Sequence, residues 1–530
     1  MNTARRRARV WPCPTGPEMR AIDRDAIERA GIPGRTLMET AGRAIAEAIA
    51  RHYPEKCRPL VACGGGNNGG DGYVVARVLA EQGRGVVPLV LDLARPESQS
   101  PEAKANSELL EAAGVETRGA GSATELAALL AASDLVVDAV FGIGLTRPVE
   151  GRVAEILRAL AASGLPCVAV DLPSGLSSET GRPLGMALEA DLIVSLGLPK
   201  LGLALLPTRA RILIADIGLP AESVERAQVR AHVLSRSAAG ALLPARPLAG
   251  HKGSFGHVLV VGGSPGKTGA VLLAAQGALR AGAGLVSLAA PGSLYPIYAG
   301  GLAEAICVVL EAADNGGLAE QHVAALAREL ETRDALVLGP GLGQHPGSAA
   351  LARALLVRAR VPAVVDADAL NAFAGELEAL RSESPRILTP HPGEAARLLG
   401  CSTAEIQDDR AAAARALAAR SGAIALLKGA RSVIATPTGE LCVNPTGGPG
   451  LAAGGSGDVL AGLLGALLGQ GLSAWDAARV GAFLHGLAGD LGPTVGGLAS
   501  ELASRIPSAW QALAAAGDQA DEPGTLVPFP

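Results

Sequence analysis

The chain has 530 residues, among them 69 glycines and 35 prolines, and aromatic residues make up 2% of it. A hydrophobic fraction of 49% is enough to bury full cores, and at roughly 150 residues per domain the length predicts two to four domains, which excludes a disordered or collagen-like chain. A formal net charge of −5 with so few aromatic side chains offers neither the basic field nor the stacking platforms of nucleic-acid binding proteins, so no nucleic-acid partner is expected.

The cysteine usage and the apolar runs bear on the compartment. The 7 cysteines are odd in number and include no CxxC pair, which argues against a disulfide framework or a zinc site and favours a reducing, cytoplasmic location. The longest apolar stretch, residues 459–472, is short of the ~20 residues that cross a membrane, so no membrane segment is expected. Arginines open the chain, but prolines follow where a signal peptide needs its apolar core. We therefore expect residues 1–17 to be a disordered tail.

In the first half of the chain, segments with a helical spacing of apolar residues alternate with short continuous apolar runs. Residues 17–53 repeat apolar side chains at spacings of three and four, which predicts helix. Helices are also expected at 101–113 and 153–162. Short apolar runs between them predict strands at residues 60–63, 86–91, 135–140, 167–171, 192–196 and 211–214. Because these runs are continuously apolar, the strands are expected to be buried on both faces of a doubly wound parallel sheet.

A second alternation begins after a more polar, proline-containing stretch at residues 220–246, and we place a domain boundary near residue 230. Strands are predicted at residues 257–261, 285–290, 335–338, 363–366, 387–388, 424–427 and 432–435. Helices are predicted at 349–359, at 404–419 and from about residue 458. The sequence therefore predicts two separate α/β domains.

A glycine-rich loop, CGGGNNGGDG at residues 63–72, follows a predicted strand and opens a helix. Glycines allow backbone amides to converge on an anion at a helix N-terminus, and the carboxamides of Asn67 and Asn68 can orient there without adding charge. The pattern GxGxxG arises easily by chance in such a run, and no lysine completes a Walker A loop. The loop thus predicts a phosphate cradle, with a merely tight strand-to-helix turn as the alternative.

Two further strand ends of the first half carry oxygen ligands. Asp138 interrupts an apolar strand that runs into FGIGLTRP at residues 141–148, and the strand at 167–170 leads into Asp171 and DLPSG. Ligands of open α/β sheets bind outside the carboxyl ends of the strands, so the three loops should meet. Asn68, Asp138 and Ser174 offer hard oxygen ligands that suit a cation other than zinc. A hydrogen-bonded structural role for Asp138, and turn capping for Asp171, remain alternatives.

The strongest motif of the second half is GGSGDVLAGLLGALLG at residues 454–469. Unpaired amides of Gly455, Ser456 and Gly457 at the helix start can stabilise a transferring phosphoryl group, with Asp458 as base. The helix dipole favours the carboxylate by about 0.3 to 1 kcal/mol, less than one pKa unit, so burial could outweigh it. A purely structural Asp458 at the helix N-terminus is the alternative.

Other loops of the second half are KTGA at residues 267–270, GPGLG at 339–343, TPHPGE at 389–394 and KGARS at 428–432. His391 lies between two prolines and is either a turn residue or a ligand contact. Asp366 and Asp368 could hold magnesium through water or could cap a strand end.

With these motifs in hand, residues 18–219 resemble the epimerase domain of bifunctional NAD(P)H-hydrate repair enzymes, and residues 231–514 are similar to ADP-dependent NAD(P)H-hydrate dehydratases, which have a ribokinase-like fold. The resemblance implies a Rossmann-like α/β epimerase domain at 18–225 and a ribokinase-like α/β dehydratase domain at 231–516, with a tail at 517–530. Ser456 stands where the family is expected to have threonine, and both hydroxyls donate.

The resemblance also implies site residues. The epimerase substrate is expected to contact Asn67, Asn68, Gly69, Gly70, Asp71, Gly142, Ile143, Gly144, Leu145, Thr146, Arg147, Pro148 and Asp171. Potassium is expected at Asn68, Asp138 and Ser174. The dehydratase substrate is expected at Ala270, Gly341, His391 and Asp458, and the adenine nucleotide at Lys428, Gly429, Ala430, Arg431, Ser432 and Gly457. Asp171 and Asp458 are the expected catalytic carboxylates.

The implied activity is metabolite repair. One domain interconverts the R and S forms of hydrated NADH and NADPH, called NADHX and NADPHX, and the other phosphorylates the hydroxyl of the S form at the expense of ADP or ATP and eliminates phosphate. K⁺ and Mg²⁺ are the expected ions, and a homo-oligomer is expected. The rival hypothesis is a ribokinase-type small-molecule kinase fused to a nucleotide-binding module.

Overall fold

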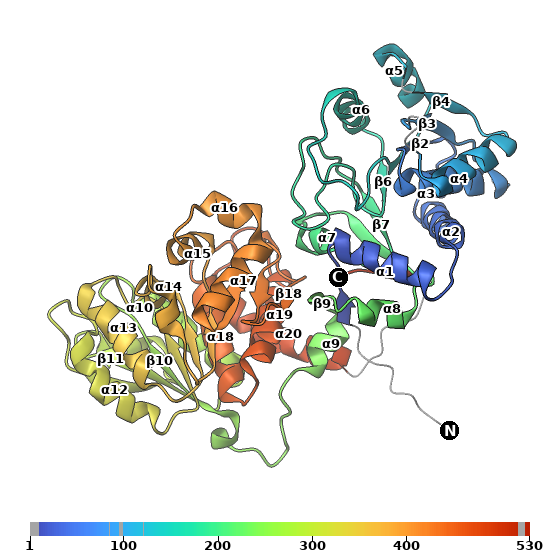
Figure 1. Cartoon of the computed structure of the whole chain (residues 1–530). Helices are drawn as coiled ribbons and strands as arrows, with labels where there is room; N and C mark the ends of the chain where they lie inside the picture. Colours follow the sequence, from blue (N-terminus) through green and yellow to red (C-terminus); the bar gives the residue numbers. More distant parts are fainter. Residues whose placement is uncertain (1–9, 84, 95–98, 120, 518–524) are drawn as a thin grey trace, which may run out of the picture. The chain divides into compact units, whose positions relative to one another are not determined.

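The computed structural model describes residues 10–83, 85–94, 99–119, 121–517 and 525–530. Its chain divides into two compact units between His232 and Val233. The N-terminal unit consists of residues 11–232 together with residues 525–530, and the C-terminal unit consists of residue 10 together with residues 233–517 (Figure 1). The division falls within the short strands β1 (Val10–Pro12) and β9 (Ala231–Leu234), which are described below with the C-terminal sheet. Each unit has its own sheet and its own site.

The N-terminal unit alternates strands and helices. Its elements are α1 (Gly16–Glu28), α2 (Gly34–His52), β2 (Pro59–Cys63), α3 (Asn67–Glu81), β3 (Leu89–Asp92), α4 (Pro101–Ala112), β4 (Thr117–Gly119), α5 (Ala123–Ala131), β5 (Leu135–Ala139), α6 (Gly151–Ala162), β6 (Cys167–Val170), β7 (Leu192–Leu196), α7 (Leu201–Leu205), β8 (Arg211–Ala215), α8 (Ala221–Arg226) and β19 (Leu526–Pro528).

The sheet of this unit is doubly wound, as the sequence predicts. Its strand order is β19-β8-β7-β6-β5-β2-β3-β4, and its strand pairs are parallel apart from β19 with β8. The chain builds outward from β2 in one direction and then returns to β5 to build in the other. The topological switch point therefore lies between β2 and β5, where Cys63 pairs with Ala139.

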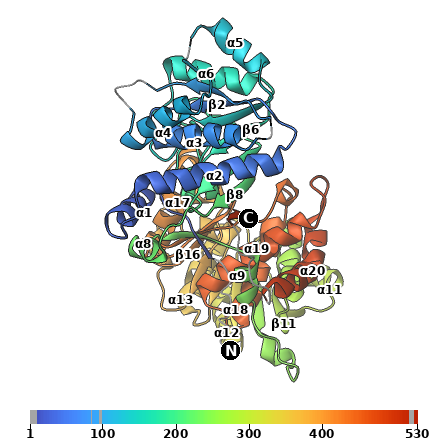
Figure 2. The ribbon, with the colours of Figure 1, turned by 90° about the vertical axis from the view of Figure 1, so that its right-hand side faces the viewer.

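Helices cover both faces of this sheet, which explains the continuously apolar strands. Figure 2 shows α2, α3 and α4 on one face and α5 and α6 on the other. Val61 and Val137 pack in the core under the first face, whereas Leu60 and Val136 pack under the second. Alternate residues of one strand thus pack into the two cores on opposite faces of the sheet. Polar side chains are therefore tolerated at the strand ends.

The predicted helical region at residues 17–53 is in fact two helices. A capping box between Thr15 and Glu18 starts α1. Gly31, at a φ of 72°, turns the chain after α1, and Pro33 precedes the first residue of α2. A helical periodicity that continues across a short break does not reveal the break, because both helices bury apolar stripes against the same unit.

The C-terminal unit contains a longer series of elements. These are β9 (Ala231–Leu234), α9 (Arg236–Ala241), η2 (Lys252–Phe255), β10 (His257–Val261), α10 (Thr268–Arg280), β11 (Leu285–Pro291), α11 (Tyr295–Gly301), β12 (Ile306–Leu310), η3 (Glu320–His322), α12 (Val323–Leu330), β13 (Ala335–Leu338), α13 (Pro346–Arg358), β14 (Ala363–Val365), α14 (Ala367–Asn371), η4 (Leu377–Leu380), β15 (Arg386–Leu388), α15 (Pro392–Leu399), α16 (Thr403–Asp408), α17 (Arg410–Ser421), β16 (Ile424–Leu427), β17 (Val433–Ala435), β18 (Leu441–Val443), η5 (Pro449–Leu451), α18 (Ser456–Gly469), α19 (Ala474–Asp490) and α20 (Ala499–Gly517).

Its sheet also has a switch point. The strand order is β1-β9-β18-β17-β16-β15-β14-β13-β10-β11-β12, where β1 is Val10–Pro12. Strands β10 to β16 pair in parallel, and β16, β17 and β18 pair antiparallel. The chain reverses direction between β10 and β13, where Val261 pairs with Leu338. The loops after β10, β13, β14, β15 and β16 therefore open at one edge of the sheet.

Two glycines let α18 lie close against α10 in the core. A Cβ atom on Gly462 would lie 1.7 Å from the carbonyl oxygen of Ala274, and one on Gly277 would lie 2.3 Å from that of Val459. Neither position can hold a side chain without separating the helices. The glycines of the GGSGD motif's helix thus fix where its first turn stands relative to β10 and β13.

Three expectations about chain segments are corrected. The helix expected at residues 404–419 is α16 followed by α17, because Asp409 leaves helical geometry and caps α17 through its side chain. The expected tails are partly ordered: residues 10–12 form β1, and residues 526–528 form β19. Phe529 is buried and stacks edge-on with Trp11 at 5.9 Å between ring centroids. The remaining tail residues, 1–9 and 518–524, lie outside the described residues.

Across the described helices, none combines the length and the hydropathy needed to cross a bilayer.

Candidate active sites

A cavity of about 560 Å³ opens in the N-terminal unit at the β2/β5 switch point. Its walls come from α1, α2, the start of α3, the loop after β5 and the ends of β6 and β7. The three strand-end loops of the first half meet there. Of the expected substrate residues, the cavity is lined by Asn67, Asn68, Asp71, Gly142, Ile143, Gly144, Leu145, Thr146, Arg147 and Asp171. Gly69, Gly70 and Pro148 are not among its lining residues.

The glycine-rich loop is packed too tightly for side chains at two positions. A Cβ atom on Gly64 would lie 2.1 Å from the Val140 carbonyl oxygen, and one on Gly69 would lie 1.8 Å from the Gly64 carbonyl oxygen. Helix α3 begins at Asn67, so its first amides open into the cavity. A helix N-terminus of this kind suits an anion such as phosphate.

Asp138 is fully buried and bonds to Ser174. The Ser174 hydroxyl donates to Asp138 Oδ1 at 2.5 Å, and the Ser174 amide donates to Oδ2 at 2.7 Å. Burial raises the pKa of Asp138 to about 6, against the lowering effect of these bonds. The described residues provide it with no cationic partner. Asn68 lies against Gly142 in the same loop cluster, and its Nδ2 atom is buried without a hydrogen-bond partner among the described residues.

Asp171 stands at the end of β6 in a left-handed conformation, with a φ of 66°. Its Oδ1 atom accepts hydrogen bonds from the Leu196 amide at 3.0 Å and from Ser195, and it forms a buried ion pair with Lys200. Lys200 also donates to the Leu196 carbonyl oxygen at 2.8 Å. The lysine thus ties Asp171 to the end of β7, and its own side chain is 1% exposed.

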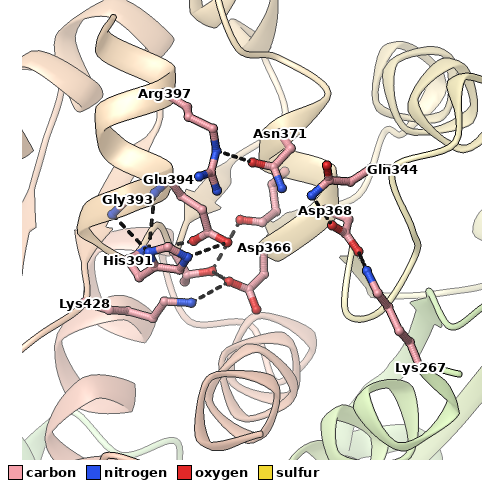
Figure 3. A network of polar contacts seen from close by, with 12 residues as sticks. Lys267, Gln344, Asp366, Asp368, Asn371, His391, Gly393, Glu394, Arg397 and Lys428 are labelled. Carbon is pink, nitrogen blue, oxygen red and sulfur yellow. Dashed lines mark hydrogen bonds and ion pairs between the residues drawn. The ribbon is translucent and has the colours of Figure 1, made fainter. Parts of the chain in front are cut away.

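The second site lies at the carboxyl ends of β14, β15 and β16 (Figure 3). Lys428 Nζ forms an ion pair with Asp366 Oδ1 at 2.9 Å, and the Thr389 hydroxyl donates to the same oxygen at 2.7 Å. Both contacts are made to Oδ1 of Asp366. The other carboxylate oxygen, Oδ2, accepts no hydrogen bond within the described chain. Asp366 is thus a buried anion held at one oxygen.

Asp458 stands in the first turn of α18, where the GGSGD motif predicts it. Burial raises the pKa of Asp458 to about 7, with further raising by the charge of Asp366, while Lys428 opposes the shift. A Cβ atom on Gly457 would lie 3.2 Å from Lys428 Nζ, so the lysine reaches the helix start. Burial therefore outweighs the dipole and gives the carboxylate a pKa suited to a base at neutral pH.

A buried histidine supports this helix start. His485 Nε2 lies 2.9 Å from the Ser456 carbonyl oxygen, which can only accept, so Nε2 carries the proton. Burial lowers the pKa of His485 to about 4, which keeps the ring neutral. The Ser456 hydroxyl donates to the Leu451 carbonyl oxygen at 2.9 Å. A threonine hydroxyl could make the same bond.

His391 has a structural role. Its Nδ1 accepts from the amides of Gly393 at 3.0 Å and Glu394 at 3.4 Å, which caps α15, and its side chain is half exposed (Figure 3). A capping histidine with a half-exposed ring can also contact a ligand, so the substrate contact expected at His391 stays a prediction. Gly341 and Ala270 lie together: a Cβ atom on Gly341 would stand 3.0 Å from that of Ala270.

The loop from Lys428 to Ser432 joins β16 to β17. The Ser432 hydroxyl donates to the Gly429 carbonyl oxygen at 3.0 Å, and Arg431, at a φ of 53°, donates to the Pro445 carbonyl oxygen at 3.1 Å. On the other side of the site, Asp368 pairs with Lys267 at 3.0 Å and accepts from the Gly343 amide at 2.9 Å. The loops after β10, β13, β14 and β16 are thus linked by polar contacts.

Among the cavity residues that the sequence analysis missed are Lys200 and Asp23. Lys200 is a single lysine in a loop and belongs to no motif. The sequence indicates only that a charged residue stands between the apolar runs of β7 and α7. Asp23 belongs to the polar face of amphipathic α1, where a carboxylate is usually solvated. Both line the first cavity.

The two units define a class of enzyme: a Rossmann-like α/β domain with a glycine-lined cavity, followed by a ribokinase-like α/β domain with an aspartate at a glycine-rich helix start. Family models agree. Residues 34–202 match the model described as YjeF-related protein N-terminus, and residues 258–509 match NAD(P)H-hydrate dehydratase.

Curated relatives match nearly the whole chain. The bifunctional NAD(P)H-hydrate repair enzyme of Moorella thermoacetica is 44% identical over 90% of this chain and 91% of its own, and that of Escherichia coli is 37% identical over 89% and 88%. A solved ADP/ATP-dependent NAD(P)H-hydrate dehydratase from Bacillus subtilis, co-crystallised with ATP and Mg²⁺, is 32% identical over 53% of this chain and 97% of that one, with a TM-score of 0.46. The chain belongs to the family of bifunctional NAD(P)H-hydrate repair enzymes.

Proposed function

We propose that the N-terminal unit interconverts the R and S forms of NADHX and NADPHX, and that the C-terminal unit converts the S form back to NADH or NADPH at the expense of ADP or ATP. The observation that carries the proposal is Asp458 at the start of α18, with Lys428 against the preceding glycine. A base beside a cationic group at a phosphate-binding helix start is the arrangement that phosphoryl transfer to a hydroxyl requires.

In the second reaction, Asp458 takes the proton of the substrate hydroxyl while that oxygen attacks the terminal phosphoryl group of the nucleotide. Lys428 and the amides at the start of α18 stabilise the negative charge on the transferring group. The phosphate then leaves with the electron pair of the carbon–oxygen bond, and loss of a proton from the neighbouring ring carbon restores the double bond. The nucleotide that gave up its terminal phosphoryl group leaves as AMP from ADP, or as ADP from ATP. The other products are the reduced nicotinamide and inorganic phosphate.

In the first reaction, the cavity at the switch point holds the substrate. The α3 N-terminus and the loop after β5 receive its phosphates, and Asp171 contacts the hydrated nucleotide through Oδ2, which is free of hydrogen bonds within the described chain. The cavity lining supports the substrate residues expected from the sequence at positions 67, 68, 71, 142–147 and 171, and leaves Gly69, Gly70 and Pro148 without such support.

A potassium ion fits the residues around Asp138. The Asp138 carboxylate is buried without a cationic partner in the described chain, and the hydroxyl of Ser174 and the amide of Asn68 lie in the same loop cluster. We assign K⁺ to Asn68, Asp138 and Ser174, where it would neutralise the carboxylate and fix the loop after β5. The ion would supply charge and position to the phosphate-binding loop.

A magnesium ion fits the second site through Asp366, whose Oδ2 is free of hydrogen bonds among the described residues. Mg²⁺ keeps several waters and binds one or two carboxylates together with substrate phosphates, so a complete cage of side chains is not required. The ion would neutralise nucleotide phosphates. The adenine nucleotide is assigned to Gly457 and to the loop from Lys428 to Ser432.

The test is recovery of the near-ultraviolet absorbance of reduced nicotinamide from a mixture of R and S NADHX with the purified chain and ADP or ATP. Two phases are expected: consumption of the S form, then a slower phase set by epimerisation. A stable phosphorylated alcohol without recovered absorbance would instead support the small-molecule kinase. A recovery that stops when the S form is spent would remove the epimerase from the proposal.

A cytoplasmic location and a homo-oligomeric state are also proposed. NADH and NADPH are made and used in the cytoplasm, so their hydrates arise there. Size-exclusion chromatography with light scattering measures the oligomeric state, and a monomer at micromolar concentration would contradict it.

A further inference from the structure

Three aspartates line the first cavity. Asp23 on α1, Asp71 on α3 and Asp171 after β6 all line it, together with Lys200. The charges on its remaining lining residues are those of Arg20, Glu102 and Arg147. Lys200 is the ion-pair partner of Asp171, so its charge is already matched, and the other two aspartates have no ion pair within the described chain.

These carboxylates differ in what holds them. Asp171 Oδ1 accepts hydrogen bonds from Ser195 and the Leu196 amide and forms an ion pair with Lys200, so this oxygen is already fully engaged. Asp23 is half-buried, and within the described chain its side chain makes neither a hydrogen bond nor an ion pair. An unpartnered carboxyl group that faces a cavity is available to a ligand.

The electrostatic surroundings favour a proton on Asp23. Burial raises the pKa of Asp23 to about 6; Lys200 lowers it and Asp171 raises it by a smaller amount. Burial and the charges of Asp171 and Asp23 raise the pKa of Asp71 well above its usual range. Near neutral pH, Asp23 therefore exchanges its proton readily, which a group that both gives and takes a proton requires.

Building on the proposed epimerase function, we propose that Asp23 is a further catalytic residue of the first site: its carboxyl group protonates the departing hydroxyl of the hydrated ring and takes a proton back from the water that returns to the opposite face.

The step balances without any other reactant. Hydration of the nicotinamide enamine places the hydroxyl on a carbon bonded to the ring nitrogen. The carbon–oxygen bond breaks with its electron pair going to oxygen, the Asp23 proton completes a water molecule, and the nitrogen lone pair forms a carbon–nitrogen double bond. The ring then turns over about its bond to the ribose, so that water adds to its other face from the side of Asp23. The double-bond pair returns to nitrogen, and the water's extra proton returns to Asp23. Asp171 and Lys200 position the substrate and hold a fixed local charge.

The experiment compares the full chain with its D23N variant in the two-phase assay with R and S NADHX and ADP, with the rate in the absence of enzyme subtracted at each pH. The expected result is an unchanged S phase and a kcat for epimerisation lowered ~100-fold or more, with KM changed less than threefold. In the unsubstituted chain, kcat for epimerisation should fall as pH rises above about 6, because the protonated form is lost. That limb should be missing in D23N.

The matched control is E28Q, which removes a carboxylate from the exposed end of the same helix and should behave like the unsubstituted chain. An epimerisation rate for D23N within threefold of the unsubstituted chain, with the same pH profile, would overturn the proposal. Because the S phase belongs to the other unit, the Tm of the N-terminal unit checks the fold of D23N. If that Tm falls below the value for E28Q, D23E decides: a partly restored rate with a shifted pH limb supports a catalytic carboxyl, and an unshifted limb overturns it. Failure of the unsubstituted chain to epimerise would instead reject the proposed function of the unit.

Discussion

Lys428 Nζ lies 2.9 Å from Asp366 Oδ1 and also reaches the start of α18, where a Cβ atom on Gly457 would stand 3.2 Å away. One ammonium group thus joins the end of β14 to the helix that carries Asp458. Its charge lowers the pKa of Asp458, against burial and against the charge of Asp366. The basicity of Asp458 is therefore set by neighbouring charges as well as by its own position.

Replacing Asp458 with asparagine should abolish dehydration, with a fall in kcat of about 10²- to 10⁴-fold, because an amide cannot take the hydroxyl proton. Epimerisation should be unaffected, since it belongs to the other unit. Two measurements check this: NADH recovery from the S form, and R to S conversion followed by chromatography. Equal loss of nucleotide affinity and turnover would point to a structural Asp458.

The pH dependence of dehydration should report the same group. A base must be ionised to act, and the pKa of Asp458 is raised to about 7, so kcat/KM should rise about tenfold per pH unit below 7 and level off above it. In K428M the rising part of the pH profile should move to higher pH, because the lysine charge that lowers the pKa of Asp458 is lost. If the rising part of the pH profile stays at the same pH in K428M, a group other than Asp458 controls the rate.

The structure shows how far sequence reasoning reaches. Strand β7 has the predicted bounds, because a fully apolar run between polar loops leaves one choice, whereas β1 and β19, with three residues each, are too short to produce a pattern. Glycine-rich loops follow β2, β10 and β13, the strands at the two switch points, but no pattern in the sequence shows the strand order that defines those points. The sequence did not predict Lys200 or Asp23 as site residues, because each is a single charged residue whose neighbours in the cavity are distant in the sequence. Only the fold shows that these side chains are buried or half-buried beside other charges.

Potassium binding at Asp138 predicts a stability effect besides an activity effect. In the unsubstituted chain, K⁺ should raise Tm and the epimerisation rate, because the ion binds the folded state and neutralises a buried carboxylate. In D138N, which keeps the shape but loses the charge, both should be insensitive to K⁺. Thermal unfolding in K⁺ and in tetramethylammonium salts is the measurement, and a retained K⁺ response of Tm in D138N would remove Asp138 from the site.

The close crossing of α10 and α18 predicts that G462A destabilises the C-terminal unit, although alanine favours helix over glycine by about 1 kcal/mol. The added Cβ atom would stand 1.7 Å from the Ala274 carbonyl oxygen, and overpacking of this kind costs about 1 to 3 kcal/mol or more. Dehydratase activity should fall with it, because α18 carries Asp458. The matched control is G300A on α11, where nothing lies within 4 Å and no loss of Tm is expected.

Strand β19 predicts that the end of the chain stabilises the epimerase unit. Phe529 is 7% exposed and packs on Trp11, and its amide donates to the Ile212 carbonyl oxygen at 3.0 Å. Truncation of a buried phenylalanine to alanine costs about 3 to 5 kcal/mol. F529A should therefore lower the Tm of this unit and the epimerisation rate at elevated temperature, while S-form dehydration continues at its usual rate. P530A is the control at the neighbouring exposed position, and an equal Tm for F529A and P530A would show that the strand contributes no stability.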